Sequence, residues 1–237
     1  MTVLTATAAD VRSVLAKATD GDTVRLVGRF TSIVRIEGRA FKEALLIDAS
    51  KAALAAVMIR DSVGVRWAEG RFRPREGRRA FTVTGSEAVT IERIDYQGDG
   101  LVDVAFFDEC KDVAFLDNRL IRPRGGVAFR HCDDVCAAGN RMWGWSANGV
   151  SLEEVLRGLV TRNEFLSPIR IDDTHIDAVQ GMQSRRRPNQ AIEVSRNFIA
   201  GFGTQGVLFN RKDGYLQPRN IRILDNEVMT GDAPNGL

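Results

Sequence analysis

The chain has 237 residues, of which 44% are apolar and 27% charged, with 22 glycines and only 6 prolines, a composition that excludes disordered and collagen-like chains. No apolar run approaches the roughly 20 residues that a membrane-spanning helix needs, and residues 1–10 lack the basic-then-apolar order of a secretory signal. The net charge is +2, from 33 basic and 31 acidic residues. We therefore expect neither a nucleic-acid partner nor a membrane partner.

The first residues of the chain predict a capping helix and a strand. Residues 8–18 have the spacing of a short amphipathic helix, and residues 20–26 indicate a turn followed by a first strand. Three cysteines, Cys110, Cys132 and Cys136, match no metal-binding spacing, so we interpret them as reduced core or turn residues.

Further along the chain one pattern repeats. Alternating apolar and polar residues lead to an Asn, and another apolar residue follows two places later. The pattern occupies residues 113–118, 135–140, 158–163, 192–197 and 221–226, with weaker copies that begin at Val63 and Val89. Copies that follow one another begin between 22 residues (113 to 135) and 34 residues (158 to 192) apart. Alternation predicts strands, and this period is typical of one turn of a solenoid.

A second strand series lies between these copies, at residues 126–130, 149–153, 178–182 and 206–210. Period-2 alternation turns each Val or Ala of the series and its i+2 partner to one face, which we expect to point inward. Parallel stacking from coil to coil would bury one apolar column. Asn tolerates left-handed backbone at tight corners, and stacked amides can hydrogen-bond as a ladder, so we interpret the repeated Asn residues as structural.

This pattern resembles the right-handed parallel β-helix proteins of the pectate-lyase-like superfamily, over roughly residues 20–237. The resemblance implies an all-β solenoid of about 7–9 coils whose N-terminal helix covers the open end of the stack. We expect one domain, with residues 1–20 as the cap and residues 21–237 as coils. Residues 235–237 repeat the start of a coil strand, so we expect that the chain continues past Leu237 or that a partner covers that end. By resemblance, such a partner would complete a homotrimer.

Three loops are longer than the repeat requires. Nine or ten residues separate a corner Asn from the next inward Val in most coils, but 16 separate Asn163 from Val179. The steps from Val179 to residue 192 and from Val207 to residue 221 are also lengthened. The extra residues fall in segments 164–177, 184–190 and 212–218. Loops added to a rigid scaffold are common places for binding, so we expect the site among them.

The densest polar cluster lies between the first two of these loops. Asp172, Asp173, His175, Asp177 and Gln180 form a D-x-x-H-x-D-x-x-Q string. It resembles the His/Asp cluster of some carbohydrate-active β-helix proteins, including uronate lyases and epimerases. Residues two apart on an extended segment share a face, so His175 and Asp177 can act together. The alternative is a corner pair that only fixes the loop, and for His131 we favour the structural interpretation.

Lyase or epimerase chemistry on a uronic acid needs a base, an acid and a cation for the sugar carboxylate. We expect His175 as the base, since imidazole exchanges protons near neutral pH, with Asp177 to poise it and Tyr215 as the acid. We expect substrate contacts from Gln180, Arg130, Glu153, Arg170, Arg185, Asn210 and Trp143. A hydrolase would instead use paired carboxylates, for which Glu153, Glu154, Asp172, Asp173 and Asp177 are available.

Two details of this predicted site depend on the fold. Trp143 would stack on a sugar ring or pack an edge together with Trp145, and a site drawn from Trp143, Glu153, Gln180 and Asn210 would be compact. Asp172, Asp173 and Asp177 could gather a calcium ion, but no loop has the EF-hand pattern, so we expect no metal and no other cofactor.

Two functions follow from the sequence. The first is binding of an acidic surface polysaccharide, with lyase or epimerase activity if the site is catalytic. The alternative is a non-catalytic structural or adhesive spike of a phage-like or gene-transfer-agent particle. We expect cytoplasmic synthesis and a virion-associated or extracellular setting, because no secretory signal is visible.

Overall fold

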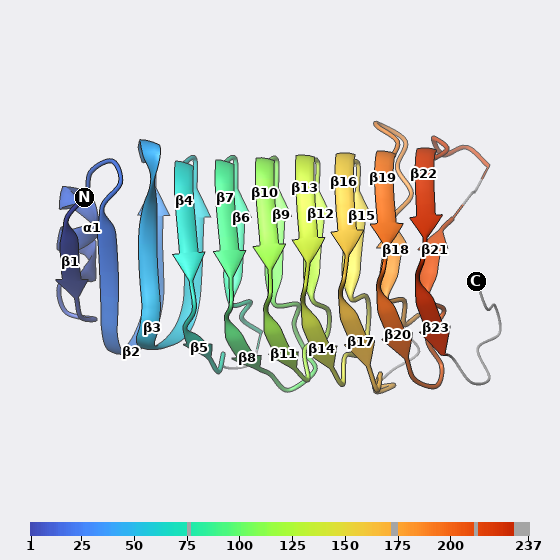
Figure 1. The fold of residues 1–237 in the computed structure, drawn as a ribbon, viewed down its shortest axis with the longest axis horizontal. Coiled ribbons are helices and arrows are strands. Elements are labelled where there is room, and N and C mark those ends of the chain that lie inside the picture. The colour runs from blue at the N-terminus through green and yellow to red at the C-terminus, as the bar shows by residue number, and fades with distance from the viewer. Residues whose placement is uncertain (75–76, 172–174, 211–212, 230–237) are drawn as a thin grey trace.

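The computed structural model describes residues 1–74, 77–171, 175–210 and 213–229. The chain winds right-handed about one long axis, and its strands stack in parallel over about eight turns (Figure 1). The predicted all-β solenoid is therefore confirmed. No helix in the described part of the chain is both long enough and apolar enough to cross a membrane.

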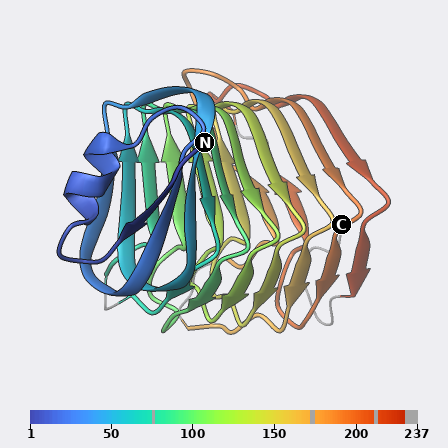
Figure 2. The ribbon, with the colours of Figure 1, turned by 60° about the vertical axis from the view of Figure 1, so that its left-hand side comes forward.

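The N-terminal end holds a strand as well as a helix. Helix α1 (Val11–Lys17) lies beside the first coil, with Leu15 buried against the core (Figure 2). Strand β1 (Val3–Ala6) precedes it and pairs in parallel with β2 (Thr23–Glu37). The first strand thus comes before the helix, whereas the sequence pattern placed it at residues 20–26. Residues 3–6 read apolar, apolar, polar, apolar, so they lack the alternation that would indicate a strand.

Two long strands build the first coils. Strand β2 and strand β3 (Ala40–Arg60) run side by side in parallel, with register shifts between Arg25 and Val27 and between Phe30 and Ile33. Such irregularities let one continuous strand bend around the solenoid and contribute to more than one of its sides.

From β4 onward each coil contributes three short strands, which stack into three parallel series. Sheet one comprises β4 (Val63–Ala68), β7 (Glu87–Glu92), β10 (Lys111–Leu116), β13 (Asp133–Ala138), β16 (Leu156–Thr161), β19 (Gln190–Ser195) and β22 (Arg219–Leu224). Sheet two comprises β5 (Arg71–Phe72), β8 (Asp95–Gln97), β11 (Arg119–Ile121), β14 (Arg141–Trp143), β17 (Glu164–Leu166), β20 (Phe198–Ala200) and β23 (Glu227–Met229). Sheet three comprises β6 (Phe81–Thr84), β9 (Ala105–Asp108), β12 (Val127–Arg130), β15 (Val150–Glu153), β18 (Val179–Gly181) and β21 (Val207–Phe209).

Inward side chains of all three sheets form one core along the axis. Val113 and Phe115 of β10 are buried, as the alternation predicts, and Phe107 stacks on Phe129 one coil later with ring centroids 5.1 Å apart. Cys110 and Cys132 are buried and Cys136 is partly buried, and all three are free thiols. The core thus leaves the outer faces and the corners between sheets for function.

The predicted Asn ladder lies at the corner between sheets one and two. The Nδ2 atoms of Asn118, Asn140, Asn163 and Asn197 each donate to the Oδ1 atom of the Asn one coil later, at 2.8–2.9 Å. The left-handed backbone, however, belongs to the residue before each Asn, for example Asp117 at φ 53° and Arg162 at φ 55°. The expectation that Asn itself takes this conformation is wrong, because its amide is used inside the coil instead.

Candidate functional site

All three lengthened loops border sheet three. The loop at residues 167–178 leads into β18, the loop at 182–189 leaves it, and the loop at 210–218 leaves β21. The two exit loops meet, since the Leu216 backbone N–H donates to the Ser184 carbonyl at 2.9 Å. The outer surface of sheet three therefore lies between the loops, and we take it as the candidate site. We call it the sheet-three face and define it by Asp108, Arg130, Glu153 and Gln180.

Neighbouring strands place Asp108, Arg130 and Glu153 side by side, and Gln180 of β18 pairs with Ser151, two positions before Glu153 on β15. Arg130 pairs in register with Asp108 of β9 and with Glu153 of β15. Its guanidinium grips Asp108 through two bonds, Nε to Oδ1 at 2.9 Å and Nη2 to Oδ2 at 2.5 Å. This hydrogen-bonded pairing lowers the pKa of Asp108 and raises the pKa of Arg130. One ion pair thus already occupies the β9 and β12 side of the face.

Gln180 and Asn210 lie farther along the same sheet. Gln180 points outward and is partly buried, and its Oε1 accepts a hydrogen bond from Asn148 Nδ2 at 2.6 Å. That bond leaves the Gln180 amide group oriented for a ligand. Asn210 directly follows β21 and is exposed.

His175 and Asp177 meet just before β18, as the sequence predicts. His175 Nδ1 lies 3.4 Å from Asp177 Oδ2, and the imidazole is 56% exposed while the carboxyl group is fully buried. Burial raises the pKa of Asp177, and the hydrogen bond from His175 partly opposes that rise. Asp172 and Asp173, the other members of the predicted cluster, lie outside the described residues.

Arg185 and Tyr215 meet at the other end of sheet three. The Arg185 guanidinium lies over the Tyr215 ring, 4.8 Å from its centroid. Arg185 is exposed in the loop after β18, and Arg170 is exposed in the loop before β18. Each of the two loops that flank the strand with Gln180 therefore contains an exposed arginine.

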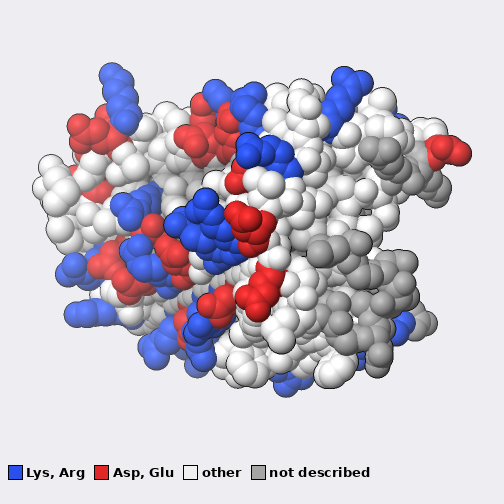
Figure 3. Space-filling model, turned by 45° about the vertical axis from the view of Figure 1, so that its right-hand side comes forward, with Lys and Arg blue, Asp and Glu red and all other residues white. Residues whose placement is uncertain are grey.

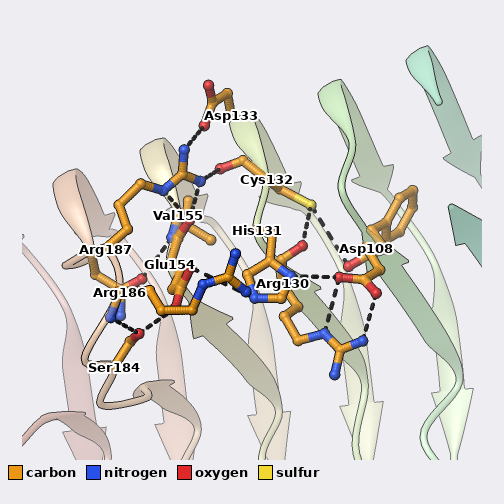
Figure 4. A network of polar contacts seen from close by, with 12 residues as sticks. Asp108, Arg130, His131, Cys132, Asp133, Glu154, Val155, Ser184, Arg186 and Arg187 are labelled. Carbon is orange, nitrogen blue, oxygen red and sulfur yellow. Dashed lines mark hydrogen bonds and ion pairs between the residues drawn. The ribbon is translucent and has the colours of Figure 1, made fainter. Parts of the chain in front are cut away.

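A corner network holds the loop after β18 against the coil (Figure 4). Ser184 Oγ donates to Glu154 Oε1, and the Arg187 guanidinium donates to the carbonyls of Glu154 and Cys132 and pairs with Asp133. The His131 ring lies between two carboxylates, with Nδ1 3.0 Å from Asp108 Oδ1 and Nε2 3.6 Å from Glu154 Oε2. His131 is a left-handed corner residue at φ 53°, in keeping with a structural role.

Two predicted groupings are wrong. Trp143 does not lie with Glu153, Gln180 and Asn210, because the chain turns a corner between β14 and β15 and leaves Trp143 on sheet two, where it is 55% exposed. Trp145 is buried against Phe165, so the two indoles do not pack one edge together. Tyr215 follows β21 along the chain, whereas His175 precedes β18.

Comparison of the sequence with protein-family models and with curated proteins found no match. Solved structures do match. A pectate lyase from Bacillus sp. N165 in complex with trigalacturonate has a TM-score of 0.63 at 11% identity, over 99% of this chain and 83% of that one. The surface adhesin PfbA of Streptococcus pneumoniae has a TM-score of 0.60 at 8% identity, over 98% of this chain and 99% of that one.

The Dettilon tailspike protein has a TM-score of 0.57 at 12% identity, over 92% of this chain but only 46% of its own length. The protein has the parallel β-helix fold. At these identities the likeness concerns the path of the β-helix backbone, so the residues of its candidate site must be argued from their own geometry.

The sequence reasoning missed two sets of residues in this β-helix. Asp108 was detectable, because Ala105–Asp108 has the same alternation as Val127–Arg130 one repeat later. The contacts of Glu154, Ser184 and Arg187 were not detectable, because they depend on how the loop folds back. Among the described residues no group of three or more His, Cys, Asp or Glu side chains is placed to hold a metal ion. Asp172 and Asp173 lie outside the described residues, so the expectation that no calcium ion binds there stays untested.

Charge on the surface is mixed rather than gathered by sign. In the face drawn in Figure 3, Lys and Arg side chains lie beside Asp and Glu side chains in neighbouring patches. Ion pairs between adjacent coils explain much of this, for example Arg141 with Glu164 at 2.6 Å and Arg157 with Asp134 at 2.5 Å. Cationic side chains without such partners are therefore informative.

Proposed function

We propose that the protein binds an acidic polysaccharide on the sheet-three face. The observation that carries the proposal is the convergence of all three lengthened loops on this one side of the solenoid. Outward polar side chains of β9, β12, β15 and β18 lie between those loops, and polar groups on successive strands can hydrogen-bond successive sugars. Neither sheet one nor sheet two has lengthened loops at both ends of its strands.

The basic side chains around this face favour an acidic sugar. Arg170 lies in the loop that leads into β18 and Arg185 in the loop that leaves it, and a planar guanidinium can hold a carboxylate through two hydrogen bonds. Arg130 is paired with Asp108, so it serves to order the face. The bound trigalacturonate of the pectate lyase is an acidic sugar chain on the same type of fold, which supports this choice without deciding it.

We assign His175 the role of base in a lyase or epimerase reaction on that polysaccharide. Its contact with buried Asp177 orients the imidazole, and its exposure leaves the other ring nitrogen accessible to a sugar proton. Tyr215 lies at the opposite end of sheet three, so we do not combine it with His175 in one reaction. Tyr215 and Arg185 instead form a binding contact at the far end.

An adhesive spike without catalysis is the alternative function. The folds of a tailspike and of a surface adhesin resemble this chain nearly as closely as the lyase fold does, with TM-scores of 0.57 and 0.60 against 0.63, which favours retaining this alternative. Loss of turnover without loss of binding in a His175 variant separates the two. A homotrimer, a further chain at the C-terminal coil, a single-domain organisation and a virion setting stay predictions.

The proposal is tested by Arg185→Ala, with Arg196→Ala as the matched control. Both arginines are exposed, but Arg196 lies at the corner between sheets one and two. We expect Arg185→Ala to lower the affinity for polygalacturonate or alginate about tenfold, the usual effect of one charge-assisted hydrogen bond. Calorimetric titration measures it, with neutral dextran as the glycan control. Equal losses in both variants, or none, would contradict binding on this face.

A further inference from the structure

A second hollow lies away from the sheet-three face. The outer surface of sheet two, over the first coils, contains a groove of about 1080 Å³. The described residues that line it include four arginines, Arg29, Arg71, Arg73 and Arg78, and one acidic residue, Asp99. The lining is therefore strongly cationic in a chain whose net charge is only +2.

The register of three strands explains the groove. Ala53 of β3 pairs with Arg29 of β2 on one side and with Arg71 of β5 on the other. Ala55 follows on the same face of β3 and also lines the groove. Small side chains on the middle strand and long ones on both neighbours leave a channel along β3. Its floor rests on buried Phe30 and Leu54, which belong to the core.

Most of the positive charge in the groove is uncompensated. Arg73 Nη2 pairs with Asp95 Oδ2 at 3.0 Å, and Asp95 also pairs with Arg119. Arg29, Arg71 and Arg78 are exposed and make no ion pair with any residue in the described ranges. Asp99 Oδ1 accepts a hydrogen bond from the Leu101 backbone. Three guanidinium groups thus face solvent around one concave surface.

We propose that this groove is a second binding site for an acidic polysaccharide, separate from the sheet-three face. Arg29 and Arg71 lie two strand spacings apart, roughly 10 Å at about 4.8 Å per strand, so one sugar chain can present carboxylates to both. Free guanidinium groups are suited to planar carboxylates. The choice of a sugar chain as the ligand rests on the proposed function. The cationic lining of the groove is an observation independent of that function.

Nucleic acid fits the groove less well. Binding of single strands depends on exposed aromatic rings on which bases stack, and the one aromatic residue that lines the groove, Phe30, is buried. The half-buried alanines and Pro74 instead present a shallow apolar surface, against which sugar rings can lie.

The test compares a double variant, Arg29→Gln with Arg71→Gln, with a control, Arg162→Gln with Arg196→Gln. Both remove two positive charges from exposed side chains, and the control pair lies at the corner between sheets one and two. Titration with polygalacturonate at low salt is the readout, with Arg185→Ala measured alongside and single-stranded DNA as a second probe. Melting curves of both double variants should match that of the unaltered protein, because none of the four substituted arginines makes an ion pair in the described part of the structure.

We expect the groove variant to bind polygalacturonate about tenfold more weakly, with a shallower salt dependence, and the control pair to bind normally. That result supports the groove even if Arg185→Ala has no effect, in which case the sheet-three proposal alone fails. Normal binding by the groove variant overturns the proposal that the groove is a binding site and leaves the sheet-three proposal intact. Tighter binding of DNA than of polygalacturonate, or no binding of either by the unaltered protein, also overturns it.

Discussion

At the scale of single residues, Asp177 is the most informative side chain. It is fully buried, its Oδ2 contacts His175, and its Oδ1 has no hydrogen-bond partner in the described part of the structure. Burying a carboxylate with so few partners is costly, and an Asn of the same shape would cost less. A buried carboxyl group that destabilises the fold, placed beside an exposed imidazole, is typical of a functional pair rather than of a structural one.

The raised pKa of Asp177 gives a prediction with a definite sign. A group that holds its proton more tightly when folded stabilises the fold at low pH, and this contribution is lost as the pH rises through its folded pKa. The non-titrating variant Asp177→Asn should therefore gain stability relative to the unaltered protein as the pH rises above 3.8, the ordinary value for Asp. Denaturant unfolding at several pH values measures the difference, with exposed Asp213→Asn as control. A flat or falling difference would refute the account of Asp177.

Some contacts of single side chains could be predicted from the sequence pattern and others could not. The contact of His175 with Asp177 could be predicted, because side chains two apart on an extended segment share a face. The partners of Arg187 could not, because its guanidinium reaches carbonyls more than thirty residues away along a loop of irregular path. The uncompensated charge of Arg29 and Arg71 could not be predicted either, because it depends on the register of the strands.

At the scale of elements, the Asn ladder links four successive pairs of coils through buried side chains. The side chain of Asn163 takes part in four hydrogen bonds: its amide donates to Asn197 and to the Ala137 carbonyl, and its oxygen accepts from the backbone and the side chain of Asn140. All of these lie in the buried corner. The repeat made this ladder predictable, but the left-handed residue before each Asn was not, because Asp, Gly and Arg share that position.

We expect Asn163→Ala to lower the free energy of unfolding by about 3 kcal/mol, because several buried polar groups lose their partners at once. The exposed Asn210→Ala serves as control and should leave stability unchanged. Urea denaturation followed by circular dichroism measures both. A loss below about 1 kcal/mol for Asn163→Ala would show that the ladder is not a major source of coil-to-coil stability.

At the scale of the whole molecule, the solenoid decides which loops share a side. Strand existence and loop length could be predicted from spacing, and so could the convergence of the lengthened loops. The placement of Trp143 could not, because each coil has three sheets while the sequence pattern revealed only two strand series. The third series, sheet two, consists of strands of two or three residues, which alternation cannot mark. The groove over β3 was hidden for the same reason.

The central claim is that the sheet-three face binds an acidic polysaccharide. A crystal structure of the protein with an oligogalacturonate at saturating concentration tests it most directly. The account predicts sugar residues across β12, β15 and β18, within hydrogen-bonding distance of Gln180 and with a carboxylate at Arg185. An oligosaccharide bound only on another side of the solenoid, or an empty sheet-three face at saturation, would contradict it.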